Sequence, residues 1–332
     1  MILPPIPQLK AEADYAYRRA RDPQKLILAY ACISTLVAAV LTLTNGWLNT
    51  QIDGTGGLSN FGLRSILATA QSVLPMLQTV ILWGLEFGYL HGILRMVRGK
   101  YADHTDLKTG FQRIFPILRL NLLMTFRFLA LGMISFYAGM MIFLYSPWSE
   151  PLVDLLMPII ESASSTADIL ALMDGVTLDL AYRALRPMTV IFGILYALVA
   201  IPMFYKLRLS AYVLADDPKG RALLAMRNST QLMRGNKRQM LKLDLHFWWY
   251  YLLSALATAV SYGDVLLSMM GISLPFSDTV AYYLFYFLYL AMLFAIYYFF
   301  RNRMAITYAK AYDSLAEKPE DNGVVLGSIF DV

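Results

Sequence analysis

The sequence has 332 residues, of which 58% are hydrophobic and only 15% are charged, with a net charge of +5. About a quarter of a soluble domain is charged, so this composition excludes an ordinary soluble globular protein and indicates a chain that lies in lipid. The single cysteine, Cys32, excludes an internal disulfide and a cysteine-rich metal site.

Six apolar runs have the length that a helix needs to cross a bilayer, about 20 residues each. They cover residues 26–44, 72–94, 117–145, 188–213, 243–263 and 280–300. Backbone groups in hydrocarbon must be hydrogen-bonded, and the runs lack the alternating pattern of a barrel strand, so each run is expected to be a helix. The sequence predicts an all-α, multi-pass membrane bundle that forms a single domain over residues 1–332.

The distribution of basic residues predicts the orientation. The two tails and the basic loops, counted with the residues that flank them, hold 24 lysines and arginines, whereas the opposite loops hold three. Basic segments stay on the cytoplasmic side, so loops 95–116 and 214–242 and both termini are expected inside. The acidic segment 146–187 is expected outside, as short amphipathic helices at the interface or as a re-entrant cap.

Loop 214–242 is expected to contain a basic amphipathic helix that begins at Pro218, because Asp217 and Pro218 form a good helix start. Leu223 and Met226 fall on one face of that helix, while Arg227 falls elsewhere. Anionic lipid headgroups are therefore the expected partners of the cytoplasmic face. Because the charge is spread over positions that flank the membrane, nucleic acid is not expected as a partner.

The same loop carries a family resemblance. The stretches 212–218, 225–229, 232–237 and 241–245, together with 92–99 and 106–113, resemble the bacterial domain-of-unknown-function family 975. The residues that carry the resemblance in the second loop are Asp216, Pro218, Ser229, Met233, Gly235, Asn236, Lys237 and Asp244. The sequence His246-Phe-Trp-Trp249 departs from the serine-led aromatic run expected there.

The resemblance covers roughly Ile81 to the end of the chain. It implies an integral membrane protein of a family without an established activity, distantly similar to the membrane domain attached to some glycerophosphodiester phosphodiesterases. It therefore implies proximity to lipid, and it transfers no functional residue to this chain.

Two ionisable residues lie inside predicted spans, Glu86 in the second and Arg127 in the third. Both are expected about 12 to 13 Å from the inner boundary, so an ion pair between adjacent helices is predicted. Such residues are candidates for a transport path, together with His91. The alternative is a buried pair that fixes the register of the helices.

The second span also carries Gly84, Gly88 and Gly92 at intervals of four residues, which predicts a flat face for close helix packing. A close approach to a ligand is the alternative. The last span holds 11 aromatic residues between Tyr282 and Phe300, which predict either stacking within the bundle or a cleft for a lipid-like ligand.

The sequence contains no recognised catalytic motif or phosphate-binding loop, and His91, His104 and His246 lack the spacing of metal ligands. No cofactor is expected. The leading hypothesis is a non-catalytic membrane module, in the bacterial cytoplasmic membrane, that binds lipid or assists a protein partner or second copy of itself. The alternatives are a small transporter for an amphiphilic solute and an enzyme acting on lipid phosphates, for which Asp244 and His246 are the candidates.

Overall fold

The computed structural model describes residues 3–54, 61–150, 153–154, 157, 178–217, 220–269 and 277–316. Within these ranges the regular elements are all helices, which confirms the all-α prediction. The chain divides into two compact units, Met1–Leu120 with Arg208–Val332 and Asn121–Leu207. Each unit is described separately below, and the single domain over residues 1–332 stays a prediction.

Five helices are long and apolar enough to cross a membrane, which agrees with a multi-pass membrane protein. They are Pro23–Ile52, Gly62–Val97, Ile114–Leu144, Leu185–Asp216 and Val280–Ala316. Each covers one predicted span. The remaining predicted span, 243–263, falls on the end of α11 (Lys237–His246) and on α12 (Trp248–Ser261). With 14 residues, α12 is about 21 Å long, less than the hydrocarbon thickness of about 30 Å.

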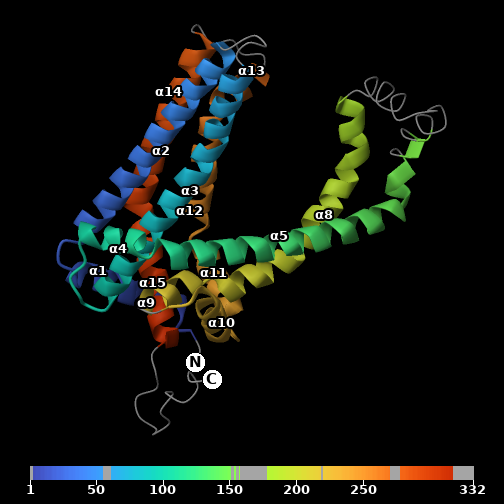
Figure 1. Cartoon of the computed structure of the whole chain (residues 1–332). Coiled ribbons are helices and arrows are strands. Elements are labelled where there is room, and N and C mark those ends of the chain that lie inside the picture. Colours follow the sequence, from blue (N-terminus) through green and yellow to red (C-terminus); the bar gives the residue numbers. More distant parts are fainter. Residues whose placement is uncertain are drawn as a thin grey trace. The chain divides into compact units, whose positions relative to one another are not determined.

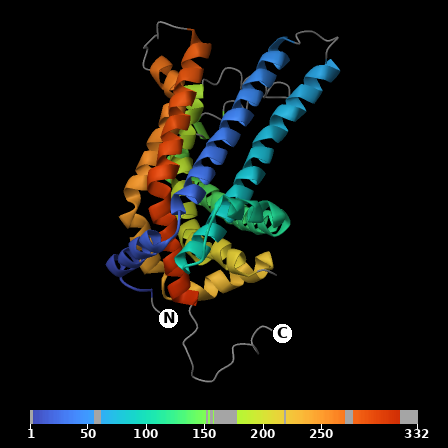
Figure 2. The ribbon, with the colours of Figure 1, turned by 90° about the vertical axis from the view of Figure 1, so that its left-hand side faces the viewer.

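The first unit contains two pairs of long helices. Helix α2 (Pro23–Gly54) packs along α3 (Phe61–Val97), and α12 packs along α14 (Asp278–Ala295), as Figures 1 and 2 show. Helix α14 continues through a π-helical turn, η4 (Ile296–Arg301), into α15 (Asn302–Ala316).

Shorter helices of this unit gather at one end of the two pairs (Figure 1). They are α1 (Ile6–Arg19), η2 (His104–Asp106), α4 (Leu107–Gln112), α9 (Ser210–Asp216), α10 (Ala222–Leu232) and α11. Helix α1 packs against α15, so the two ends of the described chain meet there.

The end of α3 is fixed by a glycine in the left-handed region. Gly99 has φ of 71°, its N–H donates to Met96 O at 3.0 Å, and the N–H of Lys100 donates to Arg95 O at 2.9 Å. These two bonds form the Schellman motif that ends many helices. A capping box on Asp103 and Asp106 then starts η2, so the chain turns sharply back onto α3.

The glycines of α3 lie where neighbouring helices come closest. A Cβ on Gly88 would lie 2.5 Å from Leu107 O of α4, and a Cβ on Gly84 would lie 3.1 Å from the ring of Phe111. A Cβ on Gly92 would lie 2.6 Å from the side chain of Leu26 in α2. Larger side chains would push these helices apart, so the stripe allows close packing on α4 and α2.

Loop 214–242 differs from the single helix that the sequence predicts. The structure has two short helices there, α10 and α11, separated by a turn in which Gly235 has φ of 86°. Helix α10 begins at Ala222, after the predicted start, and Pro218 lies outside the described residues. A non-glycine residue would be strained at this φ, so Gly235 allows the break.

The second unit contains α8 (Leu178–Leu207) and the part of α5 (Ile114–Leu144) that follows Leu120. Gly139 of α5 brings this helix close to α8, because a Cβ there would lie 3.4 Å from the Cα of Phe192. The rings of Phe192 and Tyr196 stack at 5.8 Å. Most of the predicted external segment 146–187 lies outside the described residues, and so do the helices expected in it.

Candidate functional site

Glu86 of α3 accepts hydrogen bonds from two side chains of the first unit, those of Arg301 and Tyr30. Arg301, at the end of the π-helical turn, forms an ion pair with the carboxylate, and the Tyr30 hydroxyl donates to Glu86 Oε2 at 2.7 Å. The guanidinium of Arg301 also lies over the rings of Tyr30 and Tyr297, at 5.2 and 4.9 Å from their centroids. Three helices thus meet at one carboxylate.

This arrangement corrects the predicted partner of Glu86. The sequence pairs it with Arg127 because the two lie at similar depth, but the structure pairs it with Arg301. Arg127 belongs to the second unit. The prediction placed Arg301 in the C-terminal tail because the apolar run ends at Phe300. In the structure the helix continues to Ala316, and the Arg301 side chain points toward Glu86.

A second cluster surrounds Asp244 of α11, a buried residue with 8% exposure. Arg208 donates to Asp244 Oδ1 at 3.1 Å and Tyr251 donates to the same oxygen at 3.0 Å. The hydroxyl of Tyr308 donates to it as well, and the Arg208 guanidinium lies 4.6 Å from the centroid of the Tyr308 ring. His246 follows on the same helix and accepts from Lys10 Nζ at 2.7 Å.

Arg98 forms a third cluster, beyond the end of α3. It donates to Asp216 of α9 and to Asp313 of α15, the latter at 2.8 Å, and Tyr312 donates to Asp216 at 2.9 Å. The hydrogen bond to Asp216 raises the pKa of the Arg98 guanidinium above its ordinary value. One guanidinium therefore joins α3, α9 and α15.

His91 lies beside this third cluster, and its Nδ1 donates to the carbonyl of Ala215 at 3.2 Å. Together with Arg95 and Arg98 it lines a pocket of about 290 Å³. Thus Glu86 and His91 share α3 but belong to separate polar clusters.

The residues that carry the family resemblance hold the loop together. Ser229 accepts from the N–H of Leu209 at 3.2 Å, and Asn236 accepts from the N–H of Leu3 at 3.0 Å. Met233 is fully buried. Lys237 is the first residue of α11.

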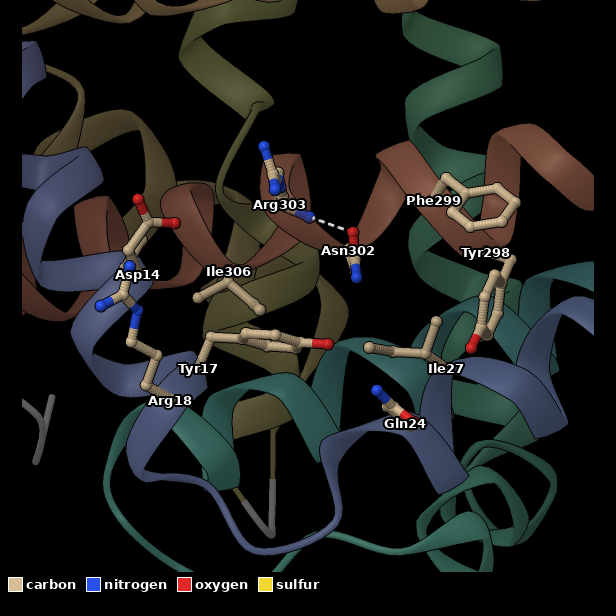
Figure 3. Close-up of a pocket in the computed structure, with 11 residues that line it drawn as sticks. Asp14, Tyr17, Arg18, Gln24, Ile27, Tyr298, Phe299, Asn302, Arg303 and Ile306 are labelled. Atoms are coloured by element: carbon tan, nitrogen blue, oxygen red, sulfur yellow. Dashed lines mark hydrogen bonds between the residues drawn. The ribbon is translucent and has the colours of Figure 1, made fainter.

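Another opening is lined by Tyr298 and Phe299 of the aromatic last span, and by no other candidate residue named from the sequence. A pocket of about 440 Å³, shown in Figure 3, lies between α1, the start of α2, η4 and α15. We call it the α1–α15 pocket. Its lining residues are Ala13, Asp14, Tyr17, Arg18, Gln24, Ile27, Tyr298, Phe299, Asn302, Arg303 and Ile306.

The α1–α15 pocket combines apolar and charged groups. Ile27 and Ile306 are buried in its wall, while Arg18, Arg303 and the carboxylate Asp14 are exposed at its rim. Figure 3 shows the Tyr17 ring lying across the pocket, with its hydroxyl directed toward Ile27 of α2. A cavity of this size and lining can hold part of an amphiphile, with an anionic group near the arginines.

Sequence reasoning missed this pocket because its two walls are about 280 residues apart in the chain, at the two tails. The signal that was present is the pairing of a basic residue with neighbouring aromatic residues in each tail. Among the residues that the structure describes, no group of three or more histidine, cysteine or acidic side chains could hold a metal ion.

Comparison of this chain with models of known protein families, with curated proteins and with solved structures finds no match. The resemblance to family 975 therefore rests on the residues of the sequence alone and stays a prediction.

Proposed function

We propose that this protein is a non-catalytic, multi-pass membrane module that binds an anionic lipid in the α1–α15 pocket. The observation that carries the proposal is the composition of that pocket: two arginines against one carboxylate, Asp14, at its rim, with aromatic rings and buried isoleucines in its wall. A lipid offers the matching chemistry, a phosphate joined to an apolar body. Tyrosine and arginine side chains are also typical of the membrane interface, where such a headgroup lies.

The location of the pocket supports this ligand. Its floor lies where the amphipathic α1 meets the first residues of α2 and the last part of the long helix 280–316. The apolar parts of both long helices extend away from it toward the hydrocarbon. A lipid could thus leave its acyl chains in the bilayer while its headgroup contacts Arg18 and Arg303.

The orientation with both termini in the cytoplasm belongs to the proposal. It is supported by the packing of α1 on α15, because a chain whose two ends lie together crosses the membrane an even number of times. Helices α12 and α13 (Gly263–Met269) are separated by the single residue Tyr262, and their 14 and 7 residues together are about the number that a sixth crossing needs. The basic rim then lies at the inner leaflet of a bacterial cytoplasmic membrane.

The polar clusters support a structural role for the charged residues inside the first unit. The carboxylates of Glu86 and Asp244 each accept from an arginine and from tyrosine hydroxyls. These charge-assisted hydrogen bonds join the neighbouring helices at each carboxylate. The third hypothesis, an enzyme acting on lipid phosphates, would need Asp244 to reach a substrate, whereas its Oδ1 already accepts from Arg208, Tyr251 and Tyr308.

The test is native mass spectrometry of the full chain purified in mild detergent and mixed with equal phosphatidylglycerol and phosphatidylcholine. We expect the protein to retain phosphatidylglycerol in preference to phosphatidylcholine. The double variant Arg18→Gln/Arg303→Gln should reduce that preference about 25-fold, because each basic residue contributes ~1 kcal/mol of attraction to an anionic headgroup. Arg227→Gln/Arg234→Gln, which removes two exposed arginines of loop 214–242, is the matched control.

Equal retention by both double variants would refute the α1–α15 pocket as the lipid site. A stoichiometric protein that co-purifies from native membranes and is lost with the pocket variant would favour the partner-assisting hypothesis instead. Movement of a solute across liposomes by the purified protein alone would refute the non-catalytic, non-transporting role.

The transporter remains the second candidate because of one observation, the ion pair of Glu86 and Arg301 within membrane-length helices. Ionisable groups at such positions commonly line ion or proton paths. The Tyr89 hydroxyl, buried beside this pair without a hydrogen-bond partner, is the group that a permeating water or ion would meet. Unchanged solute transport phenotypes in a Glu86→Gln strain would remove this candidate.

A further inference from the structure

A second opening in the first unit has a different chemistry. It is an apolar groove of about 370 Å³ between α2, α3 and α4. Ala29, Ile33 and Val37 form the α2 wall, and Ile81 and Leu85 form the α3 wall. Residues four apart lie nearly above one another on a helix, so each wall is a straight row of side chains along the helix axis.

The groove exists because the three helices pack unequally. Gly84, Gly88 and Gly110 draw α4 so close to α3 that a Cβ on Gly110 would overlap the Gly84 carbonyl. On the α2 side the wall begins with the small residue Ala29, which leaves the space between α2 and α4 unfilled. Phe111 of α4 contacts the groove at its base.

Polar groups are confined to one end of the groove. Lys108 of α4 and His104 of η2 line it there, and both side chains are exposed. The capping box on Asp103 holds η2 in place, which fixes the position of His104 relative to α4. A cation at the end of a straight apolar slot is the arrangement that complements an acidic headgroup with an extended chain.

We propose that this groove binds one acyl chain of an anionic glycerophospholipid, with the lipid phosphate at Lys108. Helices α2 and α3 are both long and apolar enough to cross a membrane, so the groove opens onto hydrocarbon, where lipid is the available occupant. A lipid tail gains little free energy by moving from the bilayer to the protein. The rows of apolar side chains therefore determine how well the acyl chain fits, and the charge of Lys108 determines which headgroup is preferred. One basic residue near the surface then gives a preference of about fivefold for anionic over zwitterionic lipid, which is ~1 kcal/mol.

This groove is separate from the α1–α15 pocket. Ile27 lines that pocket and Ala29 lines the groove, and residues two apart lie about 200° apart around a helix. The two openings are thus on opposite faces of α2. Lipid binding can be measured independently at the two openings. The groove can therefore prove not to bind lipid while the α1–α15 pocket does, or the pocket can prove not to bind it while the groove does.

The test uses the full chain in vesicles that contain phosphatidylglycerol or phosphatidylcholine with a photoactivatable diazirine in the middle of one acyl chain. Cross-linked peptides are then mapped by mass spectrometry. Ala29→Trp fills the groove, and Leu28→Trp, at an exposed residue about 100° away from Ala29 around the same helix, is its control. Lys108→Gln removes the proposed phosphate contact, and Lys242→Gln, an exposed lysine of α11, is its control.

We expect phosphatidylglycerol to label residues 29–37 and 81–85 about five times more than phosphatidylcholine does. Lys108→Gln should abolish that preference, and Ala29→Trp should abolish the labelling itself. Both control variants should be labelled like the wild type. Labelling that persists in Ala29→Trp, or equal effects of Lys108→Gln and Lys242→Gln, would overturn the proposal. A dimer that Ala29→Trp dissociates would overturn it too, by assigning the groove to a second copy. If Ala29→Trp fails to fold, Ala29→Leu and Lys108→Gln decide the result.

Discussion

The ion pair of Glu86 and Arg301 gives the sharpest test of how the first unit is held together. Glu86→Gln leaves the Arg301 guanidinium without its counter-charge. Removing one partner of a buried pair costs about 3 to 5 kcal/mol of unfolding free energy. Because the two side chains retain 34% and 17% of their exposure, we expect a loss near the lower bound, ~3 kcal/mol.

Replacement of both partners distinguishes a direct pair from two independent residues. In Glu86→Gln/Arg301→Gln no uncompensated charge remains, so the double variant should lose less than the two single variants together. We expect a coupling energy of about 2 kcal/mol, within the range for residues in one hydrogen-bonded network. The assay is unfolding of the purified protein by sodium dodecyl sulfate in mixed micelles, followed by circular dichroism.

Arg127 supplies the matched control, since the sequence alone assigns it as the partner. Because Arg301 and Tyr30 already bind the Glu86 carboxylate, the cycle of Glu86→Gln with Arg127→Gln should be additive within about 0.5 kcal/mol. A coupling below that value for Glu86 with Arg301, or a large one for Glu86 with Arg127, would refute the structural pairing.

Three further changes test the packing and the loop contacts. Gly88→Leu should lower the unfolding free energy by about 1 to 3 kcal/mol, since its side chain would meet Leu107 O. Gly62→Leu, near the start of the same helix, is the matched control, because a Cβ there has no neighbouring atom within 4 Å. Asn236→Ala should cost about 1 to 3 kcal/mol in the same unfolding assay, because the N–H of Leu3 loses its acceptor. The bond from the His104 N–H lowers the pKa of Asp103, so its cap should stabilise η2 at neutral pH and be lost as pH falls through that lowered pKa, measurable by hydrogen exchange.

The long helices were predictable because each is encoded by a local run of apolar residues. Five of the six predicted spans coincide with helices of membrane length. The predicted span 243–263 does not correspond to one continuous helix, because α12 ends at Ser261 and α13 begins at Gly263. Because mean hydropathy is calculated over a window of many residues, it gives no sign that one residue interrupts the helix.

The polar contacts were not predictable in the same way. Arg301 lies one residue beyond an apolar run, and the π-helical turn that ends with it is not encoded by a periodic pattern. Arg18 and Arg303 come from opposite tails, and only the packing of α1 on α15 brings them to one pocket. Long-range pairing of this kind depends on tertiary contacts, which a single sequence does not show.

These contacts bear on the proposed orientation, because some of the basic residues that support it form ion pairs. At least five of the 24 tail and loop residues do so: Lys25, Arg95, Arg98, Arg208 and Arg301. Setting those five aside leaves 19 against the three of the opposite loops, so the asymmetry does not depend on charges that the fold neutralises. The arginines at the rim of the α1–α15 pocket are among the 19. The same surplus of positive charge that predicts the cytoplasmic side therefore also places the proposed lipid phosphate there.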